Sequence, residues 1–485
     1  MGNESNIDFD DTSKEIVRVN VTTELTDREN SILKRAVRKV DLRVIPMVVL
    51  LYFCAILDRS NIGSALVNGL KTGLHLSNVE EANVTSLFYV FYIILETPSN
   101  ILLKKFRPHI WFSTIGILWS ITIICLAAVK NGTAFVVLRC LLGVFESGLT
   151  PGLIGYLSYW YSRSEIGFRT ILLFFAVPIA GIVGAPLAAG FASVHIKGFL
   201  GFQNIFLLEG ILTLIVTSAS FFLIKDFPEE VKYLTPEEKE LLVNRLRDEQ
   251  GMASKSHGSI KETIACLLDW KMWVFALVNY GINNAYVVIG IFGPTLIKGY
   301  GYSGIQSTYL AIIPSCFGLF GIIFSLTLVH YKVPFVVIIT INSCIAITGF
   351  CVANFAQGKI LRLVFLGVAG FGGLANVPLP PSWMSVNQGG IYKSIISSSV
   401  IVSFGTICGV VAPHLFVSSM GPKYTQGSLY TILANACSVL LAIALSFYFR
   451  VVNKHRDNNP TDVSNLTESE QRLLNDQHPN FRYKC

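Results

Sequence analysis

Charged side chains stand inside apolar stretches of this 485-residue chain, where a buried ion needs a partner or a ligand. Asp58 and Arg59 lie in VIPMVVLLYFCAILDRSNIGSAL, and Arg139 and Glu146 lie in RCLLGVFESGLTPG. A charge at the centre of a bilayer costs roughly 2.5–3.5 kcal/mol on insertion scales, so such residues normally face a cavity or a partner. Two arginines in one layer indicate a carboxylate site, because the planar guanidinium matches two carboxylate oxygens. The alternative is an Asp58–Arg139 ion pair that only locks two helices.

The positions of the two arginines in their apolar runs predict a common depth. At a rise of ~1.5 Å per residue, Arg59 lies ~23 Å from one surface and Arg139 ~9 Å from the other, in a core ~30 Å thick. Arg139 and Glu146 share one helical face, ~10.5 Å apart along the axis. We expect that gap to leave space beside Gly143 for a small ligand or water. Arg59 and Arg139 are therefore the predicted substrate-binding cations.

Proton carriage by a carboxylate would have to use the first half of the chain. Its in-span acids are Asp58, Glu96, Glu146 and Glu209, and no Asp or Glu occurs between Asp269 and Asp457. Buried carboxyl groups can load and release protons. We assign proton coupling to Glu146, with Asp58 as second candidate and as resting partner of the arginines. For Glu146 the alternative is a purely structural acid bonded to hydroxyl groups of a neighbouring helix.

Polar and aromatic residues of the second half predict the opposite wall of the site. Asn279, Tyr280 and Asn283 fall in one apolar run, and Trp383 and Asn387 end another. Amide and phenol groups suit the polar atoms of a substrate, and an aromatic ring can stack on a ring. Hydrogen bonding between helices explains each residue equally well when it is taken alone.

The elements that position these residues are membrane-spanning helices. The chain is 52% hydrophobic and 14% charged, with mean hydropathy +0.55, which is typical of an integral membrane protein. An all-α fold follows from apolar runs near the ~20 residues that span a bilayer. We predict twelve spans: 44–66, 84–103, 110–129, 134–157, 168–192, 203–224, 272–294, 305–328, 333–353, 362–383, 394–418 and 428–449.

The polar segments divide the chain into five parts. A tail (1–43) precedes the first six-helix group (44–224), a loop (225–271) precedes the second (272–450), and a tail (451–485) follows. The loop contains YLTPEEKELLVNRLRDE, in which Thr235, Pro236 and Glu238 predict a capped helix start. The plan is that of a two-bundle transporter with its site between the halves.

Lysine and arginine placement predicts orientation. These residues concentrate before the first span, in 225–271 and after the last span, so both termini should be cytoplasmic. The +7 net charge reflects this bias and does not indicate nucleic-acid binding.

The spans contain no nucleophile–base pair, metal-ligand spacing or repeated acidic ring, which argues against an enzyme, a metal or cofactor site and a channel. We expect a monomer.

From about residue 41 to its end, the chain resembles the fungal anion:cation symporter (allantoate permease) family of the major facilitator superfamily. LDRSNIG is similar to its first-span signature and RCLLGVFESGLTPG to its fourth-span pattern. WMSVNQGG and HPNFRY resemble its tenth-span end and its C-terminal ending. The resemblance implies twelve transmembrane helices in two six-helix bundles. It also implies proton-coupled import of small organic anions such as nicotinate, pantothenate, biotin or allantoate.

The loop motif ETPSNILLKKFRPHIW resembles the family's loop between spans two and three. Glu96, Lys104, Lys105 and Arg107 are accordingly the expected gating residues. Two segments depart from the family: VHYKVPF lacks an acid, and GFQNIF stands where relatives carry Trp-Arg-Trp.

We therefore expect a proton-coupled importer of a small, vitamin-like carboxylate such as nicotinate, and a nutrient sensor on a transporter fold as the alternative. The plasma membrane is the expected location, with the endoplasmic reticulum or the vacuolar membrane as alternatives.

Overall fold

The computed structural model describes residues 26–103, 105–254, 264, 266–388, 391–459, 476, 478–479 and 481–484. Within these ranges every regular element is a helix. The first group comprises α1 (Asp27–Val67), α2 (Leu70–Gly73), α3 (Asn78–Leu103), α4 (Pro108–Ala128), α5 (Gly132–Glu146), α6 (Leu149–Leu157), α7 (Arg163–Phe174), α8 (Ala176–Ser193) and α9 (Gly201–Leu223). The connecting segment contains η1 (Pro228–Glu230) and α10 (Pro236–Ser254).

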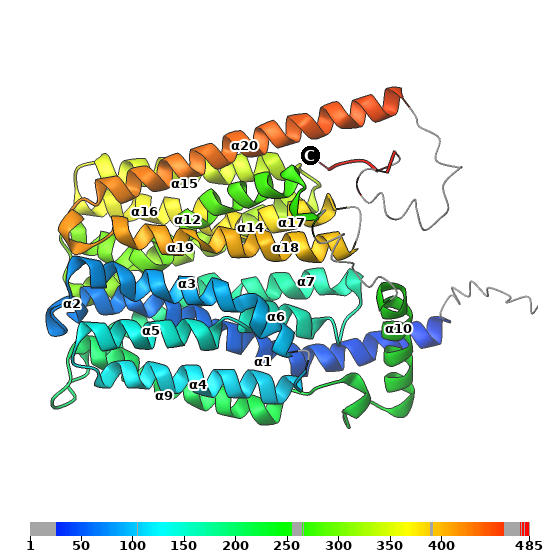
Figure 1. Ribbon diagram of the computed structural model, residues 1–485, viewed down its shortest axis with the longest axis horizontal. Coiled ribbons are helices and arrows are strands. Elements are labelled where there is room, and N and C mark those ends of the chain that lie inside the picture. The colour runs from blue at the N-terminus through cyan, green and yellow to red at the C-terminus, as the bar shows by residue number, and fades with distance from the viewer. Residues whose placement is uncertain are drawn as a thin grey trace, which may run out of the picture.

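The second group follows with α12 (Trp270–Gly299), α13 (Gly304–Leu310), α14 (Ile312–His330), α15 (Phe335–Phe355), α16 (Lys359–Asn376), α17 (Leu379–Val386), α18 (Ile391–Thr406), α19 (Cys408–Val411), η2 (Ala412–Leu415), η3 (Ser418–Met420) and α20 (Thr425–Asn458). Figure 1 shows the two groups side by side, with their long helices running lengthwise. We call the end that carries α10 the terminal end, and the end that carries α2 the distal end.

Each predicted apolar run falls within helical structure. Eleven helical segments of the described chain are long and apolar enough to cross a membrane. The remaining predicted span, 84–103, lies in the 26-residue helix α3, whose first turn carries Glu80 and Glu81. Several spans are broken rather than continuous. In the fourth predicted span, helix α5 ends at Glu146 and helix α6 begins at Leu149.

Two helix starts show the same capping chemistry. Thr235 and Glu238 bond each other's backbone N–H groups at 3.3 and 3.0 Å, which confirms the predicted start of α10. Lys39 Nζ also donates to Glu238 Oε2 at 2.7 Å and so ties α10 to α1. Thr26 and Glu29 form the same box and start α1 at Asp27, within the predicted tail and 17 residues ahead of the first predicted span.

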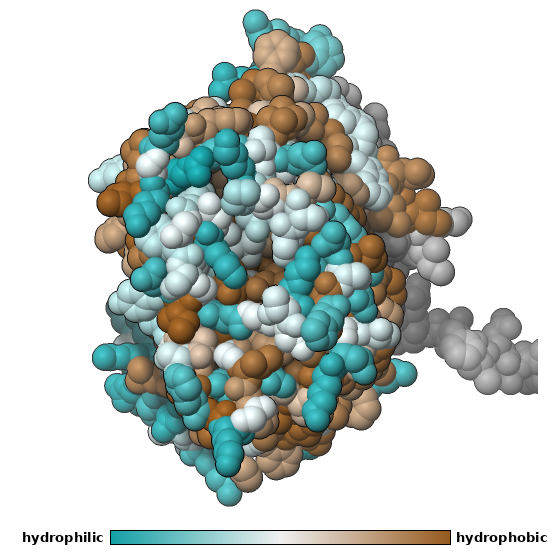
Figure 2. Space-filling model, turned by 90° about the vertical axis from the view of Figure 1, so that its left-hand side faces the viewer, coloured by the Kyte–Doolittle hydropathy of each residue, from teal (hydrophilic) through white to brown (hydrophobic). Residues whose placement is uncertain are grey.

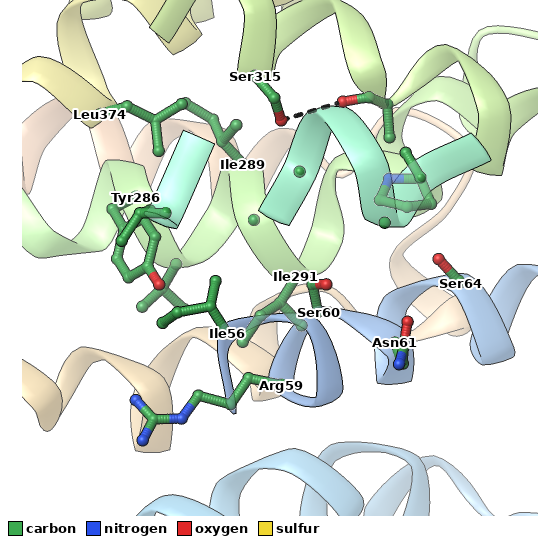
Figure 3. Close-up of a pocket in the computed structure, with 18 of the residues that line it drawn as sticks. Ile56, Arg59, Ser60, Asn61, Ser64, Tyr286, Ile289, Ile291, Ser315 and Leu374 are labelled. Carbon is green, nitrogen blue, oxygen red and sulfur yellow. Dashed lines mark hydrogen bonds between the residues drawn. The ribbon is translucent and has the colours of Figure 1, made fainter. Parts of the chain in front are cut away.

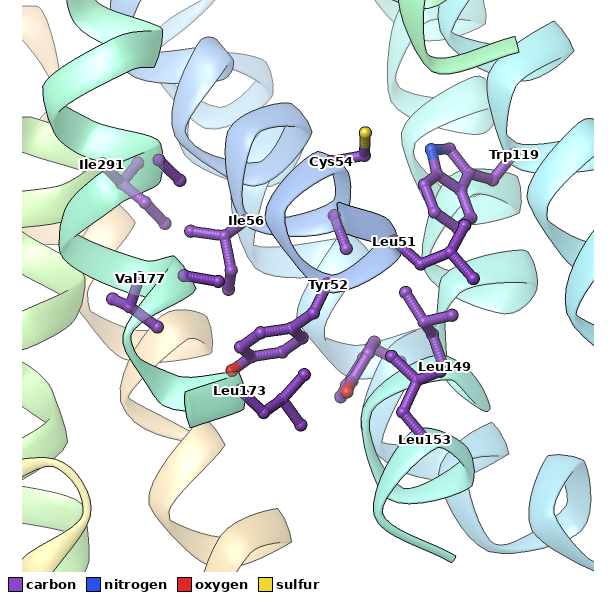
Figure 4. Close-up of a cluster of buried hydrophobic side chains, with 14 of the residues drawn as sticks. Leu51, Tyr52, Cys54, Ile56, Trp119, Leu149, Leu153, Leu173, Val177 and Ile291 are labelled. Carbon is purple, nitrogen blue, oxygen red and sulfur yellow. The ribbon is translucent and has the colours of Figure 1, made fainter. Parts of the chain in front are cut away.

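Helix α1 lies between the other helices of the first bundle and the second bundle. In Figure 4, Trp119 of α4 lies on one side of it, and Ile291 of α12, from the second bundle, lies on the other. Trp119 is fully buried and belongs to the same apolar cluster as Leu51 and Ile56 of α1. The helix that carries Asp58 and Arg59 therefore contacts both bundles and is buried along much of its length.

Three helices of the first bundle meet the second bundle: α1 packs against α12 and α13, α8 against α13 and α14, and α3 against α18, α19 and η2. Hydrogen bonds between the bundles are concentrated at the distal end. Asn68 Nδ2 donates to Thr308 Oγ1 at 2.8 Å, and the Ser418 N–H donates to Glu81 Oε1 at 2.9 Å. Figure 2 looks onto this end, where hydrophilic side chains are spread across the surface.

One glycine permits the closest approach of the two bundles. A methyl group at Gly63 of α1 would lie 1.7 Å from the carbonyl oxygen of Ile291 in α12. No side chain fits there, so the close contact of α1 with α12 at this end requires a residue without a Cβ at position 63. The conformation described is therefore closed at its distal end.

Candidate functional site

An ion pair between Arg59 and Glu146 occupies the middle of the first bundle. Arg59 Nε donates to Glu146 Oε1, which joins α1 to the last residue of α5. The Glu146 side chain has no exposed surface and the Arg59 side chain is 13% exposed. A pair removed from water to this degree loses much of its hydration, so its attraction is little screened.

Arg139 lies close to this pair and is almost completely buried, at 1% exposure. Its Nε donates to the backbone carbonyl of Val84 at 2.8 Å. The guanidinium carbons of Arg139 and Arg59 lie 4.8 and 6.0 Å from the centre of the Phe88 ring. The predicted convergence of the two arginines on one layer is therefore present, and Phe88 is the ring on which they converge.

Three polar atoms of this cluster have no hydrogen-bond partner among the described residues: Arg59 Nη2, Arg139 Nη1 and Glu146 Oε2. Leaving a buried donor unpaired costs about 1–3 kcal/mol, and more when the group is charged. Two unpaired guanidinium N–H groups offer an anion the donors that it needs. The cluster is therefore suited chemically to receive a carboxylate.

Asp58 is held elsewhere. Trp119 Nε1 donates to Asp58 Oδ2 at 2.7 Å, and Thr213 Oγ1 lies 3.4 Å from both carboxylate oxygens. Asp58 forms no ion pair with Arg59 or Arg139, so the resting partner of Arg59 is Glu146 and the predicted Asp58 pairing is corrected. Successive residues of a helix point about 100° apart, which sends Asp58 toward α4 and α9 and Arg59 toward α5.

The expected space beside Gly143 is also absent. A Cβ at Gly143 would lie 2.4 Å from the carbonyl oxygen of Phe88. The backbone of α3 fills that space, because a glycine lets two helices approach closely. Gly143 therefore brings Phe88 of α3 up to Arg139 instead of making room for a ligand.

A cavity opens next to Arg59 at the boundary between the bundles. Helices α1, α8, α12 and α14 supply most of its lining, and its polar members are Arg59, Ser60, Asn61, Ser64, Tyr89, Tyr286 and Ser315. In Figure 3, Arg59 lies at one end of the labelled residues, and Asn61 and Ser64 lie at the other. Arg59 is thus the residue that joins this cavity to the buried cluster.

The three polar residues predicted on α12 lie largely within the second bundle. Asn279 Nδ2 donates to the Ile401 carbonyl at 2.9 Å, and the Tyr280 hydroxyl bonds that of Tyr430. These are hydrogen bonds between helices, the alternative left open by the sequence. Asn283 keeps Oδ1 without a partner among the described residues. Tyr286, further along α12, lines the cavity instead.

Trp383 and Asn387 do not lie in the cavity. Trp383 Nε1 and Asn387 Nδ2 both donate to the Lys484 carbonyl, at 2.8 and 2.9 Å, and Asn387 Oδ1 accepts from the Lys484 N–H. They bind the C-terminal tail at the terminal end, because α17 ends there and carries them away from the middle of the bundle. The prediction of a substrate wall at these two positions is corrected accordingly.

An acid of the same tail also docks in this region. Asp476 is 1% exposed and accepts hydrogen bonds from Lys271 and Lys393. Tyr483 donates to it at 2.8 Å and stacks on Phe449, with ring centres 4.3 Å apart. The docked tail thus supplies an acid to a bundle whose spans contain none.

The predicted gating residues separate into two groups. Glu96 accepts a hydrogen bond from Ser403 of α18 at 2.8 Å and therefore joins the two bundles. Arg107 pairs with Asp226 and Glu230 at 3.7 and 3.4 Å, all within the first half of the chain. Lys105 is exposed, and Lys104 lies outside the described residues.

Sequence reasoning missed the aromatic surroundings of the arginines. Arg59 lies over the Tyr92 ring at 4.6 Å, and Phe88 and Tyr89 belong to the same helix. The run FYVFY at 88–92 was visible as an aromatic stretch beside Glu96. It could have been linked to the arginines as cation–π partners, but only if the facing helix were known.

Comparison with known proteins agrees with this architecture. Residues 48–413 match the Major Facilitator Superfamily. A putative tartrate transporter from Agrobacterium vitis is 34% identical over 61% of this chain and 65% of its own length. A major facilitator-type transporter from Emericella nidulans is 25% identical over 93% of each chain. This chain spans only 57–65% of the length of three relatives, of which this Agrobacterium transporter is one.

A solved structure with the same fold is a D-xylose-proton symporter, with a TM-score of 0.64 and 13% sequence identity. The structural match covers 83% of this chain and 97% of the symporter chain. The all-helical architecture with two bundles is thus shared over most of both molecules. Because the family match covers well over half of the sequence, the chain belongs to the Major Facilitator Superfamily of multi-pass membrane transporters.

Proposed function

We propose that this protein is a proton-coupled symporter that imports a small organic carboxylate by alternating access. Within the superfamily we assign it to the fungal anion:cation symporters, as its signature segments suggest. The candidate substrates are vitamin-like acids such as nicotinate, with pantothenate, biotin and allantoate as further possibilities. A carboxylate class also agrees with the name of the Agrobacterium relative, a putative tartrate transporter. Relatives named as transporters favour a carrier over the nutrient-sensor alternative.

The observation that carries the proposal is the pair of buried arginines with unpaired N–H groups. Arg59 lines the cavity between the bundles. Arg139 does not line it, but both guanidinium groups lie near the Phe88 ring. A substrate carboxylate that entered along Arg59 would find donors on both residues. Such charge-assisted hydrogen bonds contribute about 1.5–3 kcal/mol each.

Proton coupling follows from the Arg59–Glu146 pair. In the empty carrier, ionised Glu146 neutralises Arg59. A proton on Glu146 removes that partner and leaves Arg59 free to bind the substrate carboxylate, so proton and substrate load together. When the proton leaves, Glu146 competes with the substrate for Arg59 and helps to release it. Asp58, which is bound to Trp119, is the second candidate for the proton site.

The orientation completes the proposal. We infer from lysine and arginine placement that the terminal end lies in the cytoplasm, so that the closed distal end faces outward. A reporter fused within 236–254 is expected on the cytoplasmic side; an external or lumenal signal would overturn the orientation. We propose the plasma membrane as the location and a monomer as the working unit.

The test replaces Glu146 with glutamine, which has the shape of the protonated acid but carries no titratable proton. The purified variant is reconstituted in proteoliposomes, and labelled carboxylates are screened at acidic and neutral external pH. Glu146→Gln should abolish accumulation driven by a pH gradient and preserve exchange of substrate across the membrane. Exchange needs only binding and reorientation, whereas accumulation needs the proton.

Glu209→Gln is the matched control, because Glu209 is equally buried in the first bundle and forms no ion pair among the described residues. It should accumulate substrate as the wild type does. If Glu146→Gln still concentrates substrate when the outside is acidified, Glu146 is not the proton site, and Asp58→Asn becomes the decisive variant. Failure of every candidate carboxylate to be exchanged would reject the substrate class.

A further inference from the structure

A second pocket lies at the distal end of the second bundle, away from the arginine cluster. It is formed by the loop between α15 and α16 and by the start of α20. Its polar side chains are those of Asn354, Gln357, Arg362, Lys423 and Thr425, and Phe355, Ala356 and Gly358 complete the lining. None of these residues belongs to the cavity at Arg59, so the pocket needs an explanation of its own.

Two helix N-termini meet at this pocket. Helix α16 has 18 residues and is capped by Gly358, and α20 has 34 residues and begins at Thr425. Neither start has a side-chain hydrogen bond to its cap. The first-turn N–H groups of a helix carry roughly half a positive charge together, and they attract anions when no side chain satisfies them.

Two cations line the same pocket. Arg362 is fixed in place, because its Nε donates to the Ala356 carbonyl at 2.8 Å and its Nη2 to the Asn354 carbonyl at 3.2 Å. Lys423 is exposed. Since residues 270–456 contain no Asp or Glu, no acid of the second bundle's spans can neutralise these charges. Glu81 of the first bundle reaches the neighbouring loop, but Lys71 and Ser418 already bind it.

Asn354 supplies independent evidence for a ligand. It is 7% exposed, it lines the pocket, and its Nδ2 has no hydrogen-bond partner among the described residues. A buried amide donor without a partner is costly, at about 1–3 kcal/mol, unless a ligand satisfies it. The pocket therefore combines two cations, a buried amide donor and two helix N-termini, which is the chemistry that an anion with several oxygens requires.

The surroundings indicate where that anion comes from. Helices α15 and α20 pack against each other, and both expose large apolar side chains along their length, among them Phe355, Leu433 and Leu440 at 63, 55 and 67% exposure. Ile360, the second residue of α16, is 68% exposed. Apolar surface of this kind in a membrane protein faces acyl chains, and it leads directly to the pocket through Phe355.

We propose that the pocket binds a phosphate group, and that its occupant is the phosphate-bearing head group of a phospholipid in the leaflet at the distal end. The phosphate oxygens accept from the first-turn N–H groups of α16 and α20, from Asn354 and from Lys423. The acyl chains lie along α15 and α20. Free inorganic phosphate shares this chemistry but lacks the apolar part, so the two sources are separable by experiment.

The experiment uses the full-length protein purified in detergent. The site variant combines Lys423→Gln with Thr425→Asp. An aspartate in the first turn suits the helix dipole, so α20 should remain folded, yet its charge repels a phosphate. The control variant, Lys130→Gln with Lys197→Gln, loses the same net charge from exposed distal loops of the first bundle. Arg362 is left unchanged because it holds the loop together.

Native mass spectrometry measures retained phosphatidylglycerol, and thermal unfolding is recorded with inorganic phosphate. Wild type and control should bind the lipid alike, and the site variant about tenfold more weakly, as expected for the loss of one charge-assisted contact. If phosphate alone raises the Tm of wild type and control but not of the site variant, while all three retain lipid equally, the occupant is free phosphate. Equal behaviour of site variant and control with both probes would overturn the proposal.

Discussion

Replacing Arg139 with lysine should weaken substrate binding strongly while leaving the protein in the membrane. Lysine keeps the positive charge but lacks the planar fork of donors. In the structure Arg139 Nε is fixed by the Val84 carbonyl at 2.8 Å, which leaves Nη1 free in the buried cluster. The variant loses both the fixed geometry and the second donor, although its net charge is unchanged.

The magnitude follows from the contacts. One charge-assisted hydrogen bond to a substrate carboxylate contributes about 1.5–3 kcal/mol. At about 1.4 kcal/mol per factor of ten, the apparent affinity should fall by roughly ten- to a hundredfold. The Val84 carbonyl also loses its buried donor, which should lower the free energy of unfolding by about 1–3 kcal/mol. That cost is large enough to lower Tm measurably.

Uptake of the labelled carboxylate in a transporter-null host gives KM, and surface labelling corrects for the amount of protein. Arg43→Lys is the control, because Arg43 is exposed and its guanidinium lies over the Tyr233 ring at 4.3 Å, outside the site. The control is matched because Arg139 also places its guanidinium over an aromatic ring, 4.8 Å from the centre of Phe88. An unchanged KM in Arg139→Lys would refute the substrate contact; a lowered Tm with an unchanged KM would make Arg139 purely structural.

Two further variants test other contacts. Burial opposes ionisation of Asp476, but hydrogen bonds and charge from Lys271 and Lys393 outweigh it and lower the pKa of this carboxyl from 3.8 to about 2. Docking of the tail is therefore favoured by about 2 kcal/mol above pH 4 and weakens as the pH falls toward 2. Asp476→Asn should release the tail, so that limited proteolysis cleaves it at neutral pH. A tail as well protected as that of the wild type would contradict this linkage. Gly63→Ala should open the distal end, because the new methyl group cannot fit 1.7 Å from the Ile291 carbonyl and overpacking costs about 1–3 kcal/mol. Faster hydrogen exchange at the distal ends of α1 and α12 is the expected readout, and exchange equal to wild type would show that the clash is relieved locally.

The sequence by itself determined the features that depend on neighbouring residues along the chain. Apolar run length predicted the spans, and Thr235 and Glu238 predicted the start of α10, because bilayer thickness and capping geometry act on consecutive residues. The common layer of Arg59 and Arg139 was also predictable, since the rise per residue of a helix is fixed. The start of α1 at Asp27 was missed, although Thr26 and Glu29 carry the same capping pattern.

Tertiary structure alone decided which side chains meet. Asp58 binds Trp119 of α4 and Arg59 binds Glu146 of α5, a division set by how α1 is rotated against its neighbours. The backbone at Phe88 fills the space at Gly143 because two helices approach there, and no local pattern specifies which helix that is.

The docking of the tail has the same origin. Asp476 lies 205 positions from Lys271 and 83 from Lys393, and Trp383 meets Lys484 across 101 positions. Periodicity fixes the depth and face of a residue on its own helix. Partners across helices depend on rotation, crossing and close packing of whole elements, in which many small contacts are balanced together. That balance exists only once the bundles are assembled, so the ionic partners of this site are a property of the tertiary structure.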